Sequence, residues 1–97
     1  MTMRRPMLDP IGRVAAGGLN LTVLATLVQA TAAREGDILV SMDSDGEVYC
    51  TPPKHPFSRA MLRQYSNCVV GMITPTSKVD DMREDLAATR EGHRSAA

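Results

Sequence analysis

A long stretch without charge, residues 14–33, is the feature that most limits how this chain can fold. It is flanked by Arg13 and Arg34, and a membrane-spanning helix needs about 20 such residues. Small and polar residues interrupt it: Gly17, Gly18, Asn20, Thr22, Thr26, Gln29 and Thr31. Polar groups near the centre of a span oppose insertion into a bilayer. The stretch therefore favours a helix in the core of a folded domain, with a membrane anchor or signal segment as the alternative.

The same stretch has the spacing of an amphipathic helix. Its apolar residues recur at intervals of three and four: Leu21, Leu24, Ala25 and Val28, with Leu27 and Thr31 widening the stripe. Asn20 is of a type that caps helices, and Gly36 is of a type that ends them. We therefore predict a helix at 20–34. The alternative is a strand from Leu19 to Val23, where apolar and polar residues alternate.

Residues 38–51 carry the clearest local signal, that of a β-hairpin. The segment 38–42 is mostly apolar, and Val48 and Cys50 share one face of the segment 47–51. Between them lies the sequence Asp-Ser-Asp-Gly, in which Gly46 supplies a positive φ for the turn. We predict that the two segments form antiparallel strands.

A short helix is predicted after the hairpin, at 58–64. Prolines end the second strand, and Ser58 is placed to cap the helix. Met61 and Leu62 are the apolar residues that we expect to face inward.

A third strand and a last helix follow. Residues 67–74 are mostly apolar, so both faces of this strand are expected to be covered. Cys68, Val70 and Met72 would point one way, and Gly71 would mark a bulge or a close backbone approach. Ser77 with Asp80 resembles a capping box at the start of a helix at 77–90.

The chain divides into an arm, one domain and a tail. Prolines and glycines repeatedly break residues 1–18, where a short turn of helix at 11–16 is also allowed. A single domain at 19–90 and a polar tail at 91–97 complete the chain. We predict an α+β fold: a small antiparallel sheet (hairpin 38–51 plus strand 67–74), helices near 20–34, 58–64 and 77–90, and an extended N-terminal arm.

The charge balance limits the classes of partner. Lys plus Arg number 11, and so do Asp plus Glu. No net field would attract nucleic acid or an acidic ligand, so we expect no nucleic-acid partner. A chain of 97 residues forms one small domain, and other subunits often complete the stability of domains this small.

The cysteines and histidines do not form a metal or catalytic motif. Cys50 and Cys68 cannot complete a four-ligand zinc site, and His55 and His93 stand alone. Cys50 with His55 would make a nucleophile and base, but Cys50 shares the face of Val48, which favours a core thiol. We therefore expect no enzyme activity, no metal and no cofactor. We expect two buried thiols, with a disulfide as the alternative.

Three short motifs connect the middle of the chain to a known group of proteins. They are Gly36-Asp37-Ile38-Leu39-Val40, Asp45-Gly46-Glu47-Val48 and Val69-Val70-Gly71-Met72-Ile73. Over residues 36–74 the chain thereby resembles small β modules of bacteriophage virion proteins, of the capsid-decoration or tail-fibre type. It departs from their simplest form by the helix inserted before the last strand. The resemblance implies a structural protein that binds a repetitive protein lattice and has no catalytic residues.

Strands of the same kind occur in signal-peptidase-like peptidases, which need a catalytic serine and lysine. The residues available here, Ser41 and Lys54, lack the sequence contexts of those enzymes.

The arm is the expected partner-binding segment. Arg4, Arg5 and Arg13 would pair with acidic surfaces of neighbouring subunits. Apolar side chains would fill grooves there: Met3, Met7, Leu8 and Ile11. We predict a non-enzymatic assembly protein of the virion, in capsid decoration, head–tail joining or the tail, that forms a homo-oligomer and binds through its arm and sheet. The alternatives are a small membrane-anchored or exported protein that uses residues 14–33, and an intracellular adaptor.

Overall fold

The computed structural model describes residues 9–96 and shows an α+β fold, as expected from the sequence. Within these residues the β-strands are β1 (Gly12–Arg13), β2 (Ile38–Met42), β3 (Glu47–Thr51) and β4 (Val69–Ile73). The α-helices are α1 (Leu21–Glu35), α2 (Pro56–Gln64) and α3 (Val79–Ala96). Two short 3₁₀ turns are η2 (Ala16–Gly18) and η3 (Ser66–Cys68). The strands form one antiparallel sheet in the order β1-β3-β2-β4.

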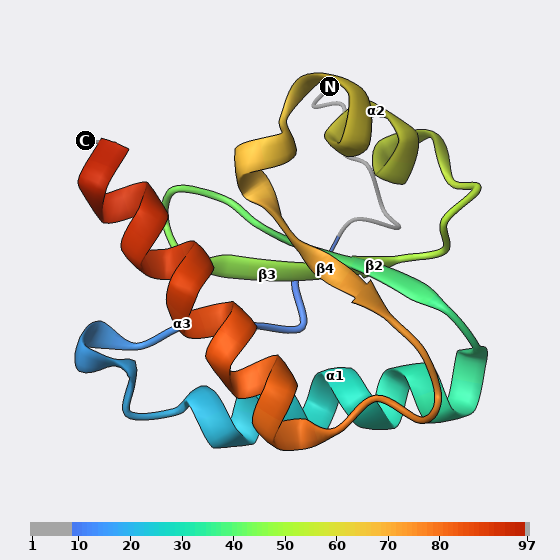
Figure 1. The fold of residues 1–97 in the computed structure, drawn as a ribbon, viewed down its shortest axis with the longest axis horizontal. Helices are drawn as coiled ribbons and strands as arrows, with labels where there is room; N and C mark the ends of the chain where they lie inside the picture. Colours follow the sequence, from blue (N-terminus) through green and yellow to red (C-terminus); the bar gives the residue numbers. More distant parts are fainter. Residues whose placement is uncertain (1–8, 97) are drawn as a thin grey trace, which may run out of the picture.

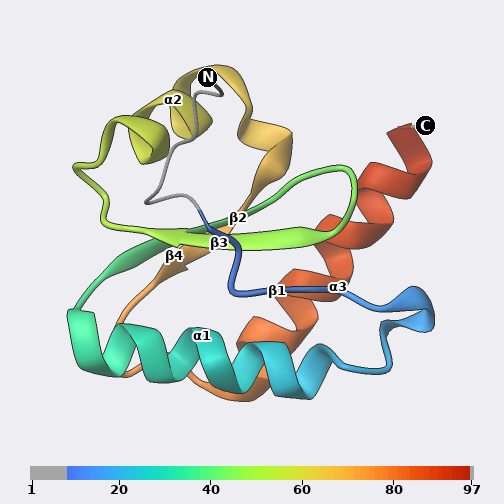
Figure 2. The same ribbon diagram turned by 180° about the vertical axis from the view of Figure 1, so that it is seen from behind.

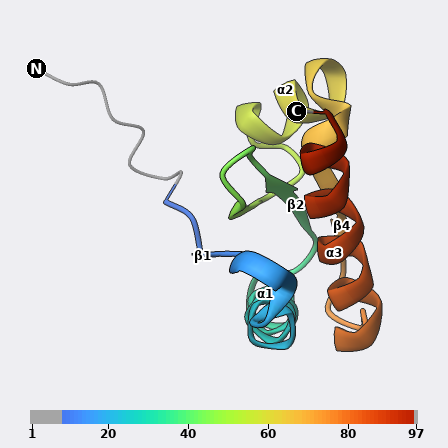
Figure 3. The ribbon, with the colours of Figure 1, turned by 90° about the vertical axis from the view of Figure 1, so that its left-hand side faces the viewer.

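The helices cover the two faces of this sheet unequally. Helices α1 and α3 lie together on one face, and the short helix α2 lies on the other (Figures 1 and 2). The edge-on view in Figure 3 shows α1 and the first turns of α3 at the same end of the molecule, with α2 at the opposite end. Strand β2 is buried along its whole length, because it is central in the sheet and is covered from both sides.

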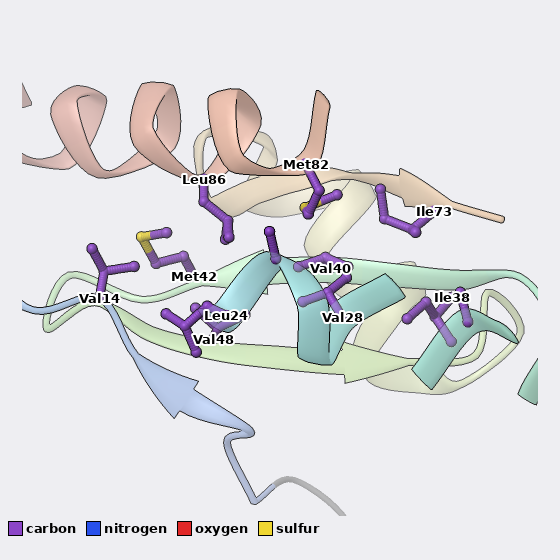
Figure 4. Close-up of a cluster of buried hydrophobic side chains, with 12 residues drawn as sticks. Val14, Leu24, Val28, Ile38, Val40, Met42, Val48, Ile73, Met82 and Leu86 are labelled. Atoms are coloured by element: carbon purple, nitrogen blue, oxygen red, sulfur yellow. The ribbon is translucent and has the colours of Figure 1, made fainter. Parts of the chain in front are cut away.

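The main core lies between the sheet and the pair α1 and α3 (Figure 4). Strands β2, β3 and β4 contribute Ile38, Val40, Met42, Val48 and Ile73, and the helices contribute Leu24, Ala25, Val28, Ala32, Met82 and Leu86. Each of these side chains is at most 5% exposed. Burial of one such side chain contributes about 1.5–3 kcal/mol, so this layer supplies much of the stability of the fold.

The predicted hairpin is confirmed. Val40 lies opposite Cys50, and Met42 lies opposite Val48. Gly46 has a φ of 87°, as the turn requires. The Asp43 carboxylate holds the turn, because its Oδ1 accepts from the backbone N–H groups of Asp45 (2.9 Å) and Glu47 (3.0 Å).

Helix α1 is confirmed, but two of its expected details are wrong. Asn20 does not cap the helix: its side chain accepts from the Ala15 N–H at 2.8 Å and donates to the Arg13 carbonyl at 2.7 Å. Leu27 does not join the buried stripe and is 45% exposed. Gly36 ends the helix as expected, with its N–H donating to the Ala32 carbonyl at 2.8 Å.

The N-terminal part of the described chain belongs to the sheet. The helical turn that the sequence allows at 11–16 does not form, since Gly12 and Arg13 pair with β3 instead. The Ile11 N–H donates to Val48 at 2.8 Å, and the Val14 N–H donates to Gly46 at 2.9 Å. Val14 enters the core, so β1 fixes the chain entry to α1.

Helix α2 begins two residues before the predicted start. His55 is its cap, because the ring Nδ1 accepts from the Phe57 N–H at 3.0 Å. Ser58 is buried instead of capping the helix, and its hydroxyl donates to the Pro52 carbonyl at 2.7 Å. Leu62, which was expected to face inward, is 51% exposed.

Strand β4 has a bulge, and this changes the predicted faces. Val40 lies opposite Gly71 but Ser41 lies opposite Val69, so Val70 is the extra residue. Val70 therefore packs against the main core, whereas Met72 lies opposite Leu39 on the other face and is 44% exposed. The expectation that Val70 and Met72 point the same way is wrong, although a bulge near Gly71 is confirmed.

Helix α3 starts later and ends later than expected. Ser77 does not form a capping box with the helix, because its hydroxyl accepts from the Thr74 N–H at 3.0 Å. At the other end the helix runs through most of the predicted polar tail, to Ala96. Two contacts hold its last turns: Arg90 donates to the Ser44 carbonyl at 2.9 Å, and His93 Nε2 lies 2.8 Å from the Met42 carbonyl. Of the helices in residues 9–96, none has the length and apolar character needed to cross a bilayer.

Candidate interaction surfaces

The outward side of α1 carries a row of exposed apolar side chains. Leu19, Val23 and Leu27 are spaced by four residues, and they are 89%, 60% and 45% exposed. Spacing by four places side chains on one side of a helix. The row begins at Leu19, just before the helix, and we call these three residues the apolar α1 face.

Residues 14–33 contribute no charged side chain around this face, and the charged group that reaches its border is Arg83 of α3 (Val79–Ala96), at Thr22. The exposed neighbours of the face on α1 are threonines and alanines: Thr22, Thr26, Ala30 and Ala33. The helix buries its opposite side, including Leu24 and Val28, in the main core. Within the uncharged stretch, one side of the helix therefore packs in the core and the opposite side faces solvent.

Helix α2 presents a basic surface at the opposite end of the molecule. Arg59 and Arg63 are exposed and lie four residues apart, so they share one side of the helix. Lys54 is exposed just before the helix. Leu62 (51% exposed) and Tyr65 (49% exposed) lie beside them in the sequence. We call Lys54, Arg59 and Arg63 the basic α2 face.

The first turns of α3 present an acidic surface. Asp80 and Glu84 are four residues apart, and so are Asp81 and Asp85; all four are exposed. Burial, and secondarily the charge of Asp81, raises the pKa of Asp85. Arg83 lies among them but points to α1, where it donates to the Thr22 hydroxyl at 3.3 Å. We call Asp80, Asp81, Glu84 and Asp85 the acidic α3 face.

Most of the predicted partner-binding residues lie outside the described part of the chain. Those are Met3, Arg4, Arg5, Met7 and Leu8. Of the other two, Ile11 packs against the main core and so belongs to the fold. Arg13 is exposed and pairs with Glu47 of β3 at 3.2 Å. The two described residues therefore attach the chain to its own sheet.

The two cysteines are free thiols at different places in the fold. Cys50 is half-buried beside the main core, and burial with the nearby Glu35 raises the pKa of its thiol to about 12. The pKa of Cys68 is also raised, by burial and then by the charge of Asp43. Cys50 of β3 lies opposite Val40 of β2, and Cys68 lies just before β4 on the other side of β2, so the two cysteines are not on neighbouring strands. Both thiols are only partly buried, whereas the sequence predicted two buried thiols.

The hydroxyl groups between the sheet and α2 hold the structure together. Thr51 and Ser58 form a buried hydrogen bond, and the Tyr49 hydroxyl donates to Asp43 at 3.2 Å. The pKa of Tyr49 is raised, first by burial and then by Asp43.

Ser41 and Lys54, the residues available for a peptidase site, differ in exposure. The Ser41 hydroxyl is buried between the sheet and α2 without a hydrogen-bond partner among the described residues, whereas Lys54 is exposed. The His55 Nδ1 is used to cap α2, where it accepts from the Phe57 N–H.

A surface hollow of about 490 Å³ lies between η2 and α3. Val14, Leu21 and Ala87 form apolar parts of its wall, and Arg90 and Glu91 add charges. Arg90 is already engaged with the Ser44 carbonyl. Among residues 9–96, no three His, Cys, Asp or Glu side chains gather where they would hold a metal ion.

Neither protein-family models nor curated proteins nor solved structures gave a match to this chain. The residue patterns of all three surfaces are present in the sequence. The spacing of Leu19, Val23 and Leu27 with no charge around them is visible in the sequence, and so are the like-charge pairs of α2 and α3. The exposure of Leu27 is not visible there, because the same residue also fits a widened core stripe.

Proposed function

We propose that this chain is a non-enzymatic assembly protein that binds other protein subunits through the apolar α1 face. The observation that carries the proposal is the exposure of Leu19, Val23 and Leu27 on a helix side without charge. The buried centre of a protein–protein interface is depleted in charged residues, whereas ordinary surfaces are not. The side of α1 that faces away from the main core is depleted in charged residues in the same way.

The chemistry of the nucleophilic groups supports a role without catalysis. A thiol whose pKa is about 12 is protonated at neutral pH, so Cys50 is not an activated nucleophile. The hydroxyls of Ser58 and Thr51 are buried and bonded to each other. These groups serve the packing of α2 on the sheet.

The proposed setting is a phage virion, where the chain would decorate a capsid, join head to tail or associate with the tail. The resemblance of residues 36–74 to virion β modules is what supports this part. The arm residues Met3, Arg4 and Arg5 would add contacts to the same lattice. Both faces of the sheet carry helices, so the contact would use α1 and the arm, and the sheet would serve as the support for α1.

The test is whether the chain co-sediments with phage particles prepared from the source of the chain. Val23→Glu with Leu27→Glu places two charges on the apolar α1 face, where both side chains are exposed and the fold tolerates them. We expect the wild-type chain to travel with large particles on a density gradient and this variant to stay at the top.

Ala88→Glu is the matched control, because it adds a charge at an exposed position on α3. It should travel with the particles. The proposal is wrong if the Val23→Glu, Leu27→Glu variant sediments with particles as the wild type does, or if the wild type never does.

A further inference from the structure

The charges of this neutral chain are sorted by helix. No acidic residue occurs between Glu47 and Asp80, and this interval contains Lys54, Arg59 and Arg63 around α2 and Lys78 just before α3. The acidic α3 face follows directly. The chain therefore has a basic surface and an acidic surface although its formal net charge is zero.

Each of these surfaces contains a like-charge pair within one helix, although the helix dipole favours acids at the start of α3 and a base at the end of α2. Arg59 and Arg63 are four residues apart on α2, and Asp80 and Glu84 are four residues apart on α3. Like charges at this spacing repel and destabilise a helix. An opposite charge from outside the helix would relieve the repulsion.

The described part of the chain does not supply that opposite charge. Within residues 9–96, the ion pairs are Arg13 with Glu47 and Arg34 with Glu35. Arg83, the base nearest to the acids in sequence, donates to Thr22 of α1. The two surfaces cannot meet within one copy, because α2 and the first turns of α3 lie at opposite ends of the molecule (Figures 1 and 3).

We propose that copies of this chain associate head to tail, with the basic α2 face of one copy on the acidic α3 face of the next. This inference rests on the proposed assembly function, and it names the contact that joins one copy to another. Arg59 and Arg63 of one copy would lie against Asp80 and Glu84 of its neighbour. Leu62 and Tyr65, exposed beside the arginines, would add apolar area to the contact.

The geometry has a consequence for the type of assembly. Two different surfaces meet in a head-to-tail contact, so each copy keeps one free surface of each sign and further copies can add. Such contacts form rings when the rotation closes and filaments when it does not. A repetitive lattice can be built from contacts of this kind.

Charge-reversed pairs of variants test the proposal in sedimentation-velocity experiments on the purified full chain. Arg59→Glu with Arg63→Glu makes both surfaces acidic, and Asp80→Lys with Glu84→Lys removes the net negative charge of the acidic α3 face, because the two lysines balance Asp81 and Asp85. All four residues are exposed and none is in an ion pair of the described chain, so circular dichroism should show the native fold. We expect each variant alone to be monomeric and an equimolar mixture of the two to associate.

Two further measurements fix the interpretation. Arg59→Lys with Arg63→Lys keeps the charge of the basic α2 face, so this variant should associate nearly as well as the wild type. Wild-type association should weaken at least about tenfold when salt rises from about 0.05 M to about 0.5 M, because exposed charges are screened. The salt dependence is measured on the wild-type chain, so it remains informative even if one substitution disturbs the fold.

Several outcomes would overturn the head-to-tail contact. A wild type that stays monomeric at low salt over the whole concentration series contradicts it. Variants that still associate alone would point to a symmetric contact elsewhere, and a mixture that fails to associate would show that these charges do not meet. None of these outcomes affects the co-sedimentation test of the apolar α1 face, so failure of the two proposals can be distinguished.

Discussion

The positive φ of Gly46 matters for both the hairpin turn and the packing around it. Its φ of 87° closes the hairpin turn, and its N–H donates to the Asp43 carbonyl at 3.0 Å. A side chain there would also meet the Val14 carbonyl oxygen at 3.3 Å. Gly46 therefore lies in the turn and close to two other parts of the fold: Val14, at the start of the core, and Arg90, in the second half of α3.

Substitution of Gly46 by alanine should therefore destabilise the protein by about 1–3 kcal/mol, from the strain of the positive φ and from the contact with Val14. Gly17→Ala is the control, because Gly17 also has a positive φ, of 75°, but a Cβ there would meet nothing within 4 Å. Urea unfolding of both variants measures the difference. Equal losses would show that the contact with Val14 does not matter.

Cys50 is the residue whose ionisation should affect stability. Its thiol pKa is about 12 in the folded protein and has an ordinary value of 9.0, so above pH 9 the unfolded chain loses a proton that the folded chain keeps. Stability is therefore unaffected below pH 9 and falls as the pH rises from about 9 toward 12. We expect the urea midpoint to fall less between pH 8 and pH 10 in Cys50→Ala than in the wild type. An identical fall in both would contradict the assignment.

At the scale of elements, the segments with strong local signals could be predicted and the long-range contacts could not. The hairpin followed from the turn chemistry around Asp43 and Gly46, and α1 followed from its apolar spacing. Strand β1 could not be predicted, because two residues carry no periodicity and their pairing with β3 is a contact between distant segments. The bulge position in β4 depends on its pairing with β2 in the same way.

The predicted caps failed for a shared physical reason. Asn20, Ser58 and Ser77 each have a side chain that caps helices well, but such side chains also bond to nearby backbone outside helices. In the fold Asn20 bonds to the loop before it, Ser58 to the Pro52 carbonyl and Ser77 to the Thr74 N–H. For the apolar α1 face, the four-residue spacing of apolar residues without charge was visible in the sequence. Its exposure was not visible, because it depends on which side of α1 packs in the core.

The end of α3 offers a test at this scale. His93 and Arg90 contact the carbonyls of Met42 and Ser44, and these two contacts hold the last turns beside the hairpin. His93→Ala with Arg90→Ala should cost about 1 kcal/mol for each hydrogen bond. We expect hydrogen exchange to become faster at 91–96 and to stay slow at Met82 and Leu86. Unchanged exchange at 91–96 would show that these contacts do not order the end of the helix.

At the scale of the whole molecule, the division of labour among the helices is the main result. One side of α1 and α3 completes the core, and the remaining sides of α1, α2 and α3 differ sharply in character: apolar, basic and acidic. A chain with zero formal net charge has little overall repulsion to keep its copies apart. In the proposed assembly, the sorted charges would give direction to the association of copies, and the apolar α1 face would provide the water-excluding contact with other subunits.

The exposure of the apolar α1 face in the free and assembled states tests this account most directly. Hydroxyl-radical footprinting followed by mass spectrometry reports the solvent exposure of Leu19 and Leu27 in the isolated chain and in the particle fraction of the gradient. The account predicts high modification of both leucines in the isolated chain and a severalfold drop in the particles, with Leu24 low in both states. Equal modification of Leu19 and Leu27 in the two states would contradict it.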